Sequence, residues 1–221
     1  MLLEYLFFDK SKSNLVEQLN DNLQEHWGKL KKDGSPPSIT YKDFDDGDCW
    51  IVRYEKSGNS EQTAIQFSEI SAKVCEESSP TILTDESAEY FNKSLYPLVN
   101  QFERRLRKLL YLKVSLCNEE KLKSTIRDIE KKDFGDIYNI LFVDNDFRSA
   151  AREKIKKLNT RSEMFEAIDS LSEKTAWDIL IGNSVLAIIK DNFDLLKEYR
   201  NDVMHAHNID YSKYNRAKKL F

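Results

Sequence analysis

The sequence contains little cysteine, histidine, glycine or proline. Of its 221 residues, three are cysteine, three histidine, six glycine and four proline. Cys49, Cys75 and Cys117 are far apart and form no C-x-x-C pair. That spacing and the odd number argue against a disulfide framework and against a cysteine-built zinc site. We therefore expect a protein of the reducing cytoplasm with no metal and no cofactor.

Signals for membranes, secretion and nucleotide-binding loops are also missing. The richest apolar runs, 179–181 and 185–189, are interrupted at 182–184 and fall short of the roughly 18 apolar residues that a membrane helix needs. The N-terminus has no basic region, and Glu4 and Asp9 bracket its apolar run, which disfavours a signal peptide. No phosphate-binding glycine motif, G-x-x-x-x-G-K or G-x-G-x-x-G, is present, so nucleotide binding through such loops is not expected.

Charge is abundant and unevenly distributed. Charged residues make up 33% of the chain, and 12 Phe, 10 Tyr and three Trp are enough aromatics for a folded protein. Residues 1–86 carry nine basic and 17 acidic side chains, whereas residues 87–221 carry 25 and 21. This asymmetry fits a C-terminal part that faces nucleic acid and an N-terminal part that faces something else. Ordinary surface variation also explains it, and the acidic part could cover the basic part.

Residues 1–85 are predicted to form a small α+β module. The turns at 45–48 and 57–59 have the Asp-Gly and Gly-Asn chemistry of hairpins. The aspartates between Asp43 and Asp48 invite a calcium-binding interpretation, but the EF-hand order fails and a hairpin turn explains them better. The predicted order is a strand, a helix and a three-strand meander, at residues 2–8, 14–30, 38–44, 49–55 and 63–67.

Residues 86–221 are predicted to be helical almost throughout. An apolar stripe runs from Phe91 to Leu110. Pro97 lies inside this stripe and should kink the helix or mark where its long part begins. A last strong helix runs from Ser184 to about His205. Shorter helices are expected at about 119–131, 134–142, 146–158, 162–171 and 174–181.

The last helix ends in the pattern R-N-x-x-x-H, formed by Arg200, Asn201 and His205. Asn201 and His205 lie about 40° apart around a helix, and the flexible Arg200 side chain can reach their face. An imidazole moves protons at neutral pH and a guanidinium stabilises charge on a phosphate, so the pattern suits phosphodiester chemistry. Alternatively, Arg200 forms an ion pair with Asp194 or Asp202. His205 is then an ordinary surface residue near a helix end.

Residues 195–205 resemble the signature of the HEPN superfamily, in which an Arg, a polar residue and a His, spaced R-x(4–6)-H, lie near the end of an all-helical domain. The helix at 96–110 is similar to the opening helix of HEPN domains in prokaryotic abortive-infection and toxin proteins, which typically carries a Glu followed by Leu-Arg. The resemblance covers about residues 87–215. It implies that the α+β module is followed by an all-α, HEPN-like helical bundle over residues 86–221.

The resemblance implies a metal-independent endoribonuclease that acts as an RNA-cleaving toxin or an anti-phage abortive-infection effector. Two subunits of a homodimer would face their motif helices toward each other and build one composite site. The family roles would fall on Arg200, Asn201 and His205 as catalytic residues. The RNA 2′-hydroxyl would be the internal nucleophile, and the product would carry a cyclic phosphate.

The partners expected are an RNA substrate, with tRNA as a candidate, and no membrane. Residues 1–85 could sense a phage component, hold an antitoxin or grip the RNA, and their acidic surface is where an antitoxin or phage trigger would bind. In a subset of HEPN toxins, a Tyr two residues after the His is the target of a nucleotidyltransferase antitoxin. This chain has His207 there, so silencing by that route is not implied.

Glu103, Arg104, Arg107, Lys108 and His207 are further candidates for RNA binding. The basic run could contact RNA phosphates or form a solvated helix face. The resemblance suggests that Glu103 orients a basic residue of the site.

A second basic cluster lies between Lys213 and Lys219, with Tyr211 and Tyr214 interleaved. Basic and aromatic residues together suit single-stranded RNA, whereas a frayed terminus is the commoner case. The alternative to an enzyme is a non-catalytic HEPN-like scaffold that binds RNA, a nucleotide or another protein, with Arg200 and His205 in structural roles.

Overall fold

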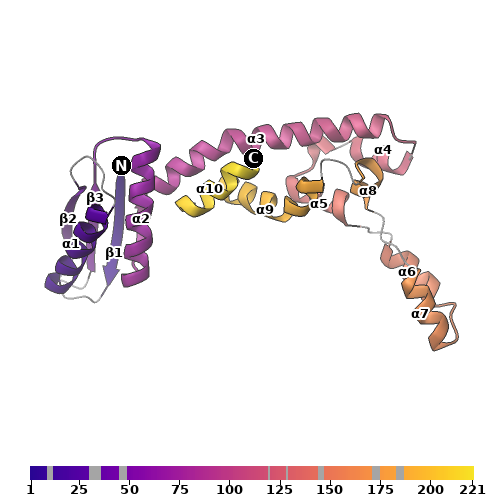
Figure 1. Ribbon diagram of the computed structural model, residues 1–221, viewed down its shortest axis with the longest axis horizontal. Helices are drawn as coiled ribbons and strands as arrows, with labels where there is room; N and C mark the ends of the chain where they lie inside the picture. Colours follow the sequence, from indigo (N-terminus) through magenta and orange to yellow (C-terminus); the bar gives the residue numbers. More distant parts are fainter. Residues whose placement is uncertain are drawn as a thin grey trace. The chain divides into compact units, whose positions relative to one another are not determined.

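A computed structural model describes nine ranges of the chain (Figure 1): residues 1–8, 12–29, 36–44, 49–118, 120–127, 129–143, 147–170, 175–182 and 187–221. The chain forms two compact units. The first unit comprises residues 1–99 and 200–221, and the second comprises residues 100–199. The boundary expected at residue 85 lies inside the first unit, and the C-terminal residues belong to that unit as well.

The first unit is built on a four-stranded antiparallel sheet with the strand order β2-β3-β1-β4. One helix connects β1 to β2 and another connects β3 to β4. This βαββαβ order, with β1 and β3 in the centre, is the ferredoxin-like topology. The elements are β1 (Leu2–Phe8), α1 (Lys12–Lys29), β2 (Ser38–Phe44), β3 (Cys49–Glu55), α2 (Glu61–Ser78) and β4 (Thr81–Asp85).

One face of the sheet is buried under α1 and α2 (Figure 1). Alternate residues of β1 and β3 point to this face because successive side chains of a strand lie on opposite sides. Their register pairs Leu3 with Tyr54, and Phe7 with Trp50, so large apolar side chains meet across the strands. The helices complete the core with Leu19, Leu23, Phe67, Ile70 and Val74.

The predicted strands at 2–8, 38–44 and 49–55 are confirmed, but the strand at 63–67 is wrong. These residues lie in the first turns of α2, where Ala64, Phe67, Ile70 and Val74 are buried at spacings of three and four. The Oγ of Ser60 accepts a hydrogen bond from the Thr63 amide at 3.1 Å and caps this helix. The fourth strand is instead β4, and the predicted turn at 45–48 lies outside the described residues.

The C-terminal residues form a docked helix, α10 (Tyr211–Leu220), in the first unit. Tyr214 is buried and stacks on Phe91 with ring centroids 4.6 Å apart, and its hydroxyl donates to Glu61 at 3.1 Å. Lys218 also donates to Glu61, at 2.9 Å. The C-terminal segment is therefore a helix and not a frayed terminus. The Tyr214 ring is buried, so it is not exposed for stacking on RNA.

The second unit is helical, as predicted. Its core contains a chain of aromatic contacts in which Phe134 stacks on Phe193 at 5.1 Å and Phe142 stacks on Trp177 at 5.1 Å. Thr160 and Thr175 each begin a helix with a capping box. Residues from 86 onward form α3 (Glu86–Ser115), α4 (Glu120–Arg127), the 3-10 helix η2 (Ile129–Lys131), α5 (Phe134–Phe142), α6 (Phe147–Ile155), α7 (Arg161–Asp169), α8 (Ala176–Leu180) and α9 (Ala187–Met204).

Helices α3 and α9 each contain a boundary between the two units. Pro97 lies within α3, which continues through it from Glu86 to Ser115. Across the described ranges, no helix combines the length and the apolar character required to cross a membrane.

Neighbouring phenylalanines of β1 provide a direct test of the sheet. Phe7 is 2% exposed in the core and Phe8 is 57% exposed on the opposite face. We expect Phe7→Ala to lower the free energy of unfolding by about 3–5 kcal/mol because it leaves a cavity. Phe8→Ala should change it by about 0.5 kcal/mol or less. Urea denaturation followed by circular dichroism measures both, and equal losses would contradict the described orientation of β1.

Candidate functional site

Helix α9 ends in a tight turn that places two histidines next to each other. The amide of Ala206 donates to the Val203 carbonyl at 3.4 Å, and the amide of His207 donates to the Asp202 carbonyl at 2.9 Å. Ala206 has φ of +52°. These two bonds and the left-handed residue between them define a Schellman motif. The imidazole rings of His205 and His207 lie with their centroids 5.9 Å apart.

The carboxylate of Asp202 is buried beside this turn and joins α9 to α10. Its Oδ1 lies 3.0 Å from Nδ1 of His207, and its Oδ2 lies 2.6 Å from Nζ of Lys213. Burial opposes ionisation, but the hydrogen bonds from Lys213 and His207 outweigh that effect and hold the pKa of the Asp202 carboxyl below its usual range. The carboxylate therefore remains charged and orients the His207 ring.

The three residues of the predicted motif lie at the same helix end, within the first unit. The amide of His205 donates to the Asn201 carbonyl at 2.9 Å, so both residues are in helical register one turn apart. Nη1 of Arg200 donates to Oδ1 of Asn201 at 3.3 Å. The His205 side chain is exposed, whereas Arg200 and Asn201 are half-buried. The guanidinium thus contacts the neighbouring amide, one helical turn from His205.

The basic run on α3, residues 104–108, belongs to the second unit, and one of its arginines is hydrogen-bonded within the protein. The Arg107 guanidinium donates to the carbonyls of Ile129 and Lys132 and to the Glu103 carboxylate. Arg107 therefore ties α3 to the segment at η2, and Glu103 orients its guanidinium; for both residues a role in RNA binding stays a prediction. Arg104 and Lys108 are exposed, and for them RNA contact stays a prediction.

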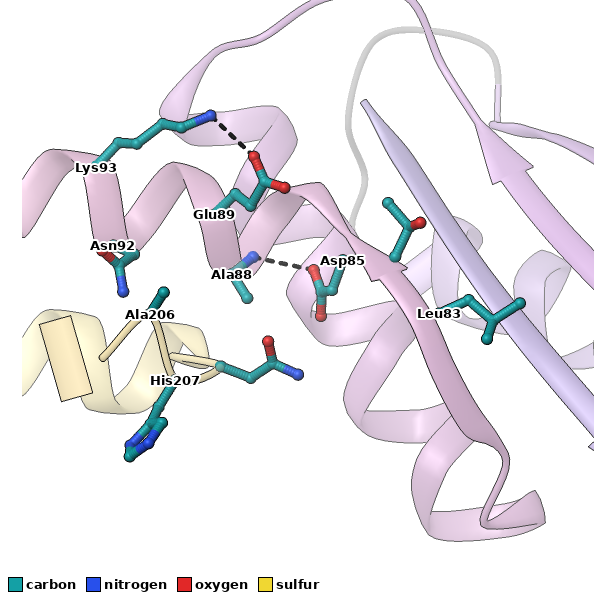
Figure 2. Close-up of a pocket in the computed structure, with 10 residues that line it drawn as sticks. Leu83, Asp85, Ala88, Glu89, Asn92, Lys93, Ala206 and His207 are labelled. Atoms are coloured by element: carbon teal, nitrogen blue, oxygen red, sulfur yellow. Dashed lines mark hydrogen bonds and ion pairs between the residues drawn. The ribbon is translucent and has the colours of Figure 1, made fainter. Parts of the chain in front are cut away.

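A pocket of about 420 Å³ adjoins the α9 turn (Figure 2). Its walls come from β4, the first turns of α3, and the turn residues Ala206, His207 and Asn208. Figure 2 shows the His207 ring pointing away from Asp85 and Glu89. Nδ2 of Asn92 donates to the Asp202 carbonyl at 3.4 Å, so one wall of the pocket is tied to the helix end.

Asp202 and Lys213 are the members of this site that sequence reasoning missed. Asp202 was considered only as an ion-pair partner of Arg200, and Lys213 only as part of a basic cluster. The useful signal is an acidic residue five positions before a histidine, across a helix end, because a Schellman turn brings those two positions together. Within the described ranges, no group of three or more His, Cys, Asp or Glu side chains is placed to hold a metal ion.

Comparisons with protein-family models, with curated proteins and with solved structures found no match.

The left-handed Ala206 gives a prediction about stability. A Cβ in this conformation is strained, whereas glycine adopts it freely. We expect Ala206→Gly to raise the free energy of unfolding by about 1 kcal/mol. Ala64→Gly, in the interior of α2, should lower it by at least about 1 kcal/mol. Thermal and urea denaturation measure both variants, and a destabilised Ala206→Gly protein would contradict the turn.

The Asp202 carboxylate predicts a pH-dependent stability. Its pKa is lowered in the folded protein, so it stabilises the fold above its unfolded pKa of about 3.9. That contribution is lost as the pH falls through the lower folded value. Asp202→Asn should lose about 1–3 kcal/mol at neutral pH, and the difference from wild type should shrink below about pH 4. Urea denaturation at pH 3 to 8 tests this, and a constant difference would refute it.

Proposed function

We propose that this protein is a metal-independent endoribonuclease of the HEPN type that acts as an RNA-cleaving toxin or anti-phage abortive-infection effector. One observation carries the proposal: the Arg200 guanidinium bonds to the Asn201 amide one helical turn from the exposed imidazole of His205. His205 is exposed at this helix end, and Arg200 and Asn201 are half-buried beside it.

Each group has a role that its chemistry supplies. His205 transfers a proton to or from the reacting oxygens, since the two nitrogens of an imidazole can donate and accept protons. Arg200 stabilises the negative charge that builds on the phosphate. The Asn201 amide accepts from Arg200 through its oxygen and positions the guanidinium. The 2′-hydroxyl of the RNA attacks the neighbouring phosphate and leaves a cyclic phosphate.

The proposed active form is a homodimer in which the ends of two α9 helices face each other. The Arg200 guanidinium and the His205 imidazole of each subunit then meet at a single phosphodiester. The dimer interface must therefore include the surface around Arg200, Asn201 and His205 and leave room between the subunits for one RNA strand.

Cleavage of tRNA and total cellular RNA in EDTA tests the function. We expect wild type to cut and to leave cyclic phosphate ends. His205→Ala should lower the rate by about 10²- to 10⁴-fold, and Arg200→Ala by about 10²- to 10³-fold. Arg152→Ala removes an exposed arginine from α6, outside the motif and outside the basic run of α3, and serves as the matched control.

Equal cutting by all variants would place the activity elsewhere and contradict the proposal, and so would a wild-type protein that cuts no RNA. For the dimer, excess His205→Ala protein added to wild type should lower the wild-type rate, because mixed dimers carry an incomplete site. A monomer by sedimentation that still cleaves RNA would refute the composite site.

A further inference from the structure

Cleavage through the 2′-hydroxyl requires two proton transfers, one away from the nucleophile and one to the leaving 5′-oxygen. Two groups that titrate near neutral pH perform these steps best when one is neutral and the other protonated. The R-N-x-x-x-H motif supplies one imidazole per chain, so a homodimer that relies on the motif alone takes its second proton-transfer group from the partner subunit. The described structure places a second imidazole, that of His207, with its ring centroid 5.9 Å from that of His205.

His207 has the surroundings of an oriented proton-transfer group. Its Nδ1 lies 3.0 Å from the Asp202 carboxylate, while 61% of its side chain is exposed. Nδ1–H donates a hydrogen bond to the carboxylate, which leaves Nε2 as the nitrogen available for proton transfer. Lys213 holds the other carboxylate oxygen at 2.6 Å, so Asp202 is fixed from two sides and cannot easily turn away from the ring.

We propose that His207, oriented by Asp202, is the second proton-transfer residue of this site and the general acid of the cleavage step. The inference rests on the proposed ribonuclease function. His207 is then a catalytic residue that contacts the leaving oxygen, and Asp202 is a positioning residue that acts through the His207 ring.

The cleavage step moves two protons, one through each imidazole. The neutral His205 imidazole takes the proton of the 2′-hydroxyl, and the 2′-oxygen forms a bond to phosphorus. The bond from phosphorus to the 5′-oxygen breaks, and the protonated His207 gives its Nε2 proton to that oxygen. The products are a 2′,3′-cyclic phosphate and a 5′-hydroxyl, with His205 protonated and His207 neutral. Proton exchange with water restores both rings.

A dinucleotide with sulfur in place of the bridging 5′-oxygen separates this role from a structural one, because a thiolate leaves without a proton. With the oxygen substrate, His207→Ala of the full-length protein should be slower than wild type by about 10²- to 10⁴-fold. With the sulfur substrate, it should come within about tenfold of wild type. His205→Ala should be slow with both substrates because the nucleophile still needs its base.

The pH profile gives a second readout. Wild type should show a bell-shaped dependence, since one ring must be neutral and the other protonated. His207→Ala should lose the decline at high pH, and His205→Ala should lose the decline at low pH. Asp202→Asn should slow the oxygen substrate by at least about tenfold and the sulfur substrate less. Met204→Ala, in the same turn, should match wild type on both substrates.

The outcomes separate the two proposals. If wild type cuts RNA and His205→Ala does not, but His207→Ala equals wild type or is equally slow on both substrates, the role of His207 is wrong and the ribonuclease stands. If wild type cuts neither substrate, the proposed function fails and this inference fails with it.

Discussion

The arrangement at the end of α9 depends on the need of one buried carboxylate for partners. A charged group cannot be buried without compensation, and Asp202 obtains it from Lys213 of α10 and from the His207 ring. Its backbone carbonyl accepts from the His207 amide and from Asn92 of α3. Three helices and the turn between two of them thus converge on a single residue, and this residue positions the exposed imidazole of His207.

Ion pairs within the first unit use part of the excess of basic residues in the C-terminal part of the sequence. Lys213 and Lys218 come from the basic C-terminal cluster, and each binds a carboxylate of the first unit, Asp202 or Glu61. Hydrogen bonds from Lys218 and Tyr214 lower the pKa of Glu61. A cluster that looks like a surface for nucleic acid is therefore used in part to attach α10 to its neighbours, through one nearby carboxylate, Asp202, and one distant in the sequence, Glu61.

Local sequence patterns predicted most of the helices and three of the strands. They failed where a short segment fits both the alternation of a strand and the three-to-four spacing of a helix. Residues 63–67 alternate well enough for a strand, and only the continuation to Ile70 and Val74 identifies the helix. Strand β4 is short and carries few apolar residues, so its assignment depends on pairing with β1. The R-N-x-x-x-H motif is visible in the sequence because its residues lie within six consecutive positions at the end of one helix. The Asp202–His207 pair is not, because Ala206 takes the left-handed position that usually signals itself by glycine.

The division of the chain into units has a consequence for the order of synthesis. The first unit is discontinuous, since residues 100–199 separate its sheet from residues 200–221. A ribosome makes the sheet and the whole second unit before Asp202, His207 and Lys213 exist. The groups proposed to cut RNA are therefore assembled only after the rest of the described chain has been made.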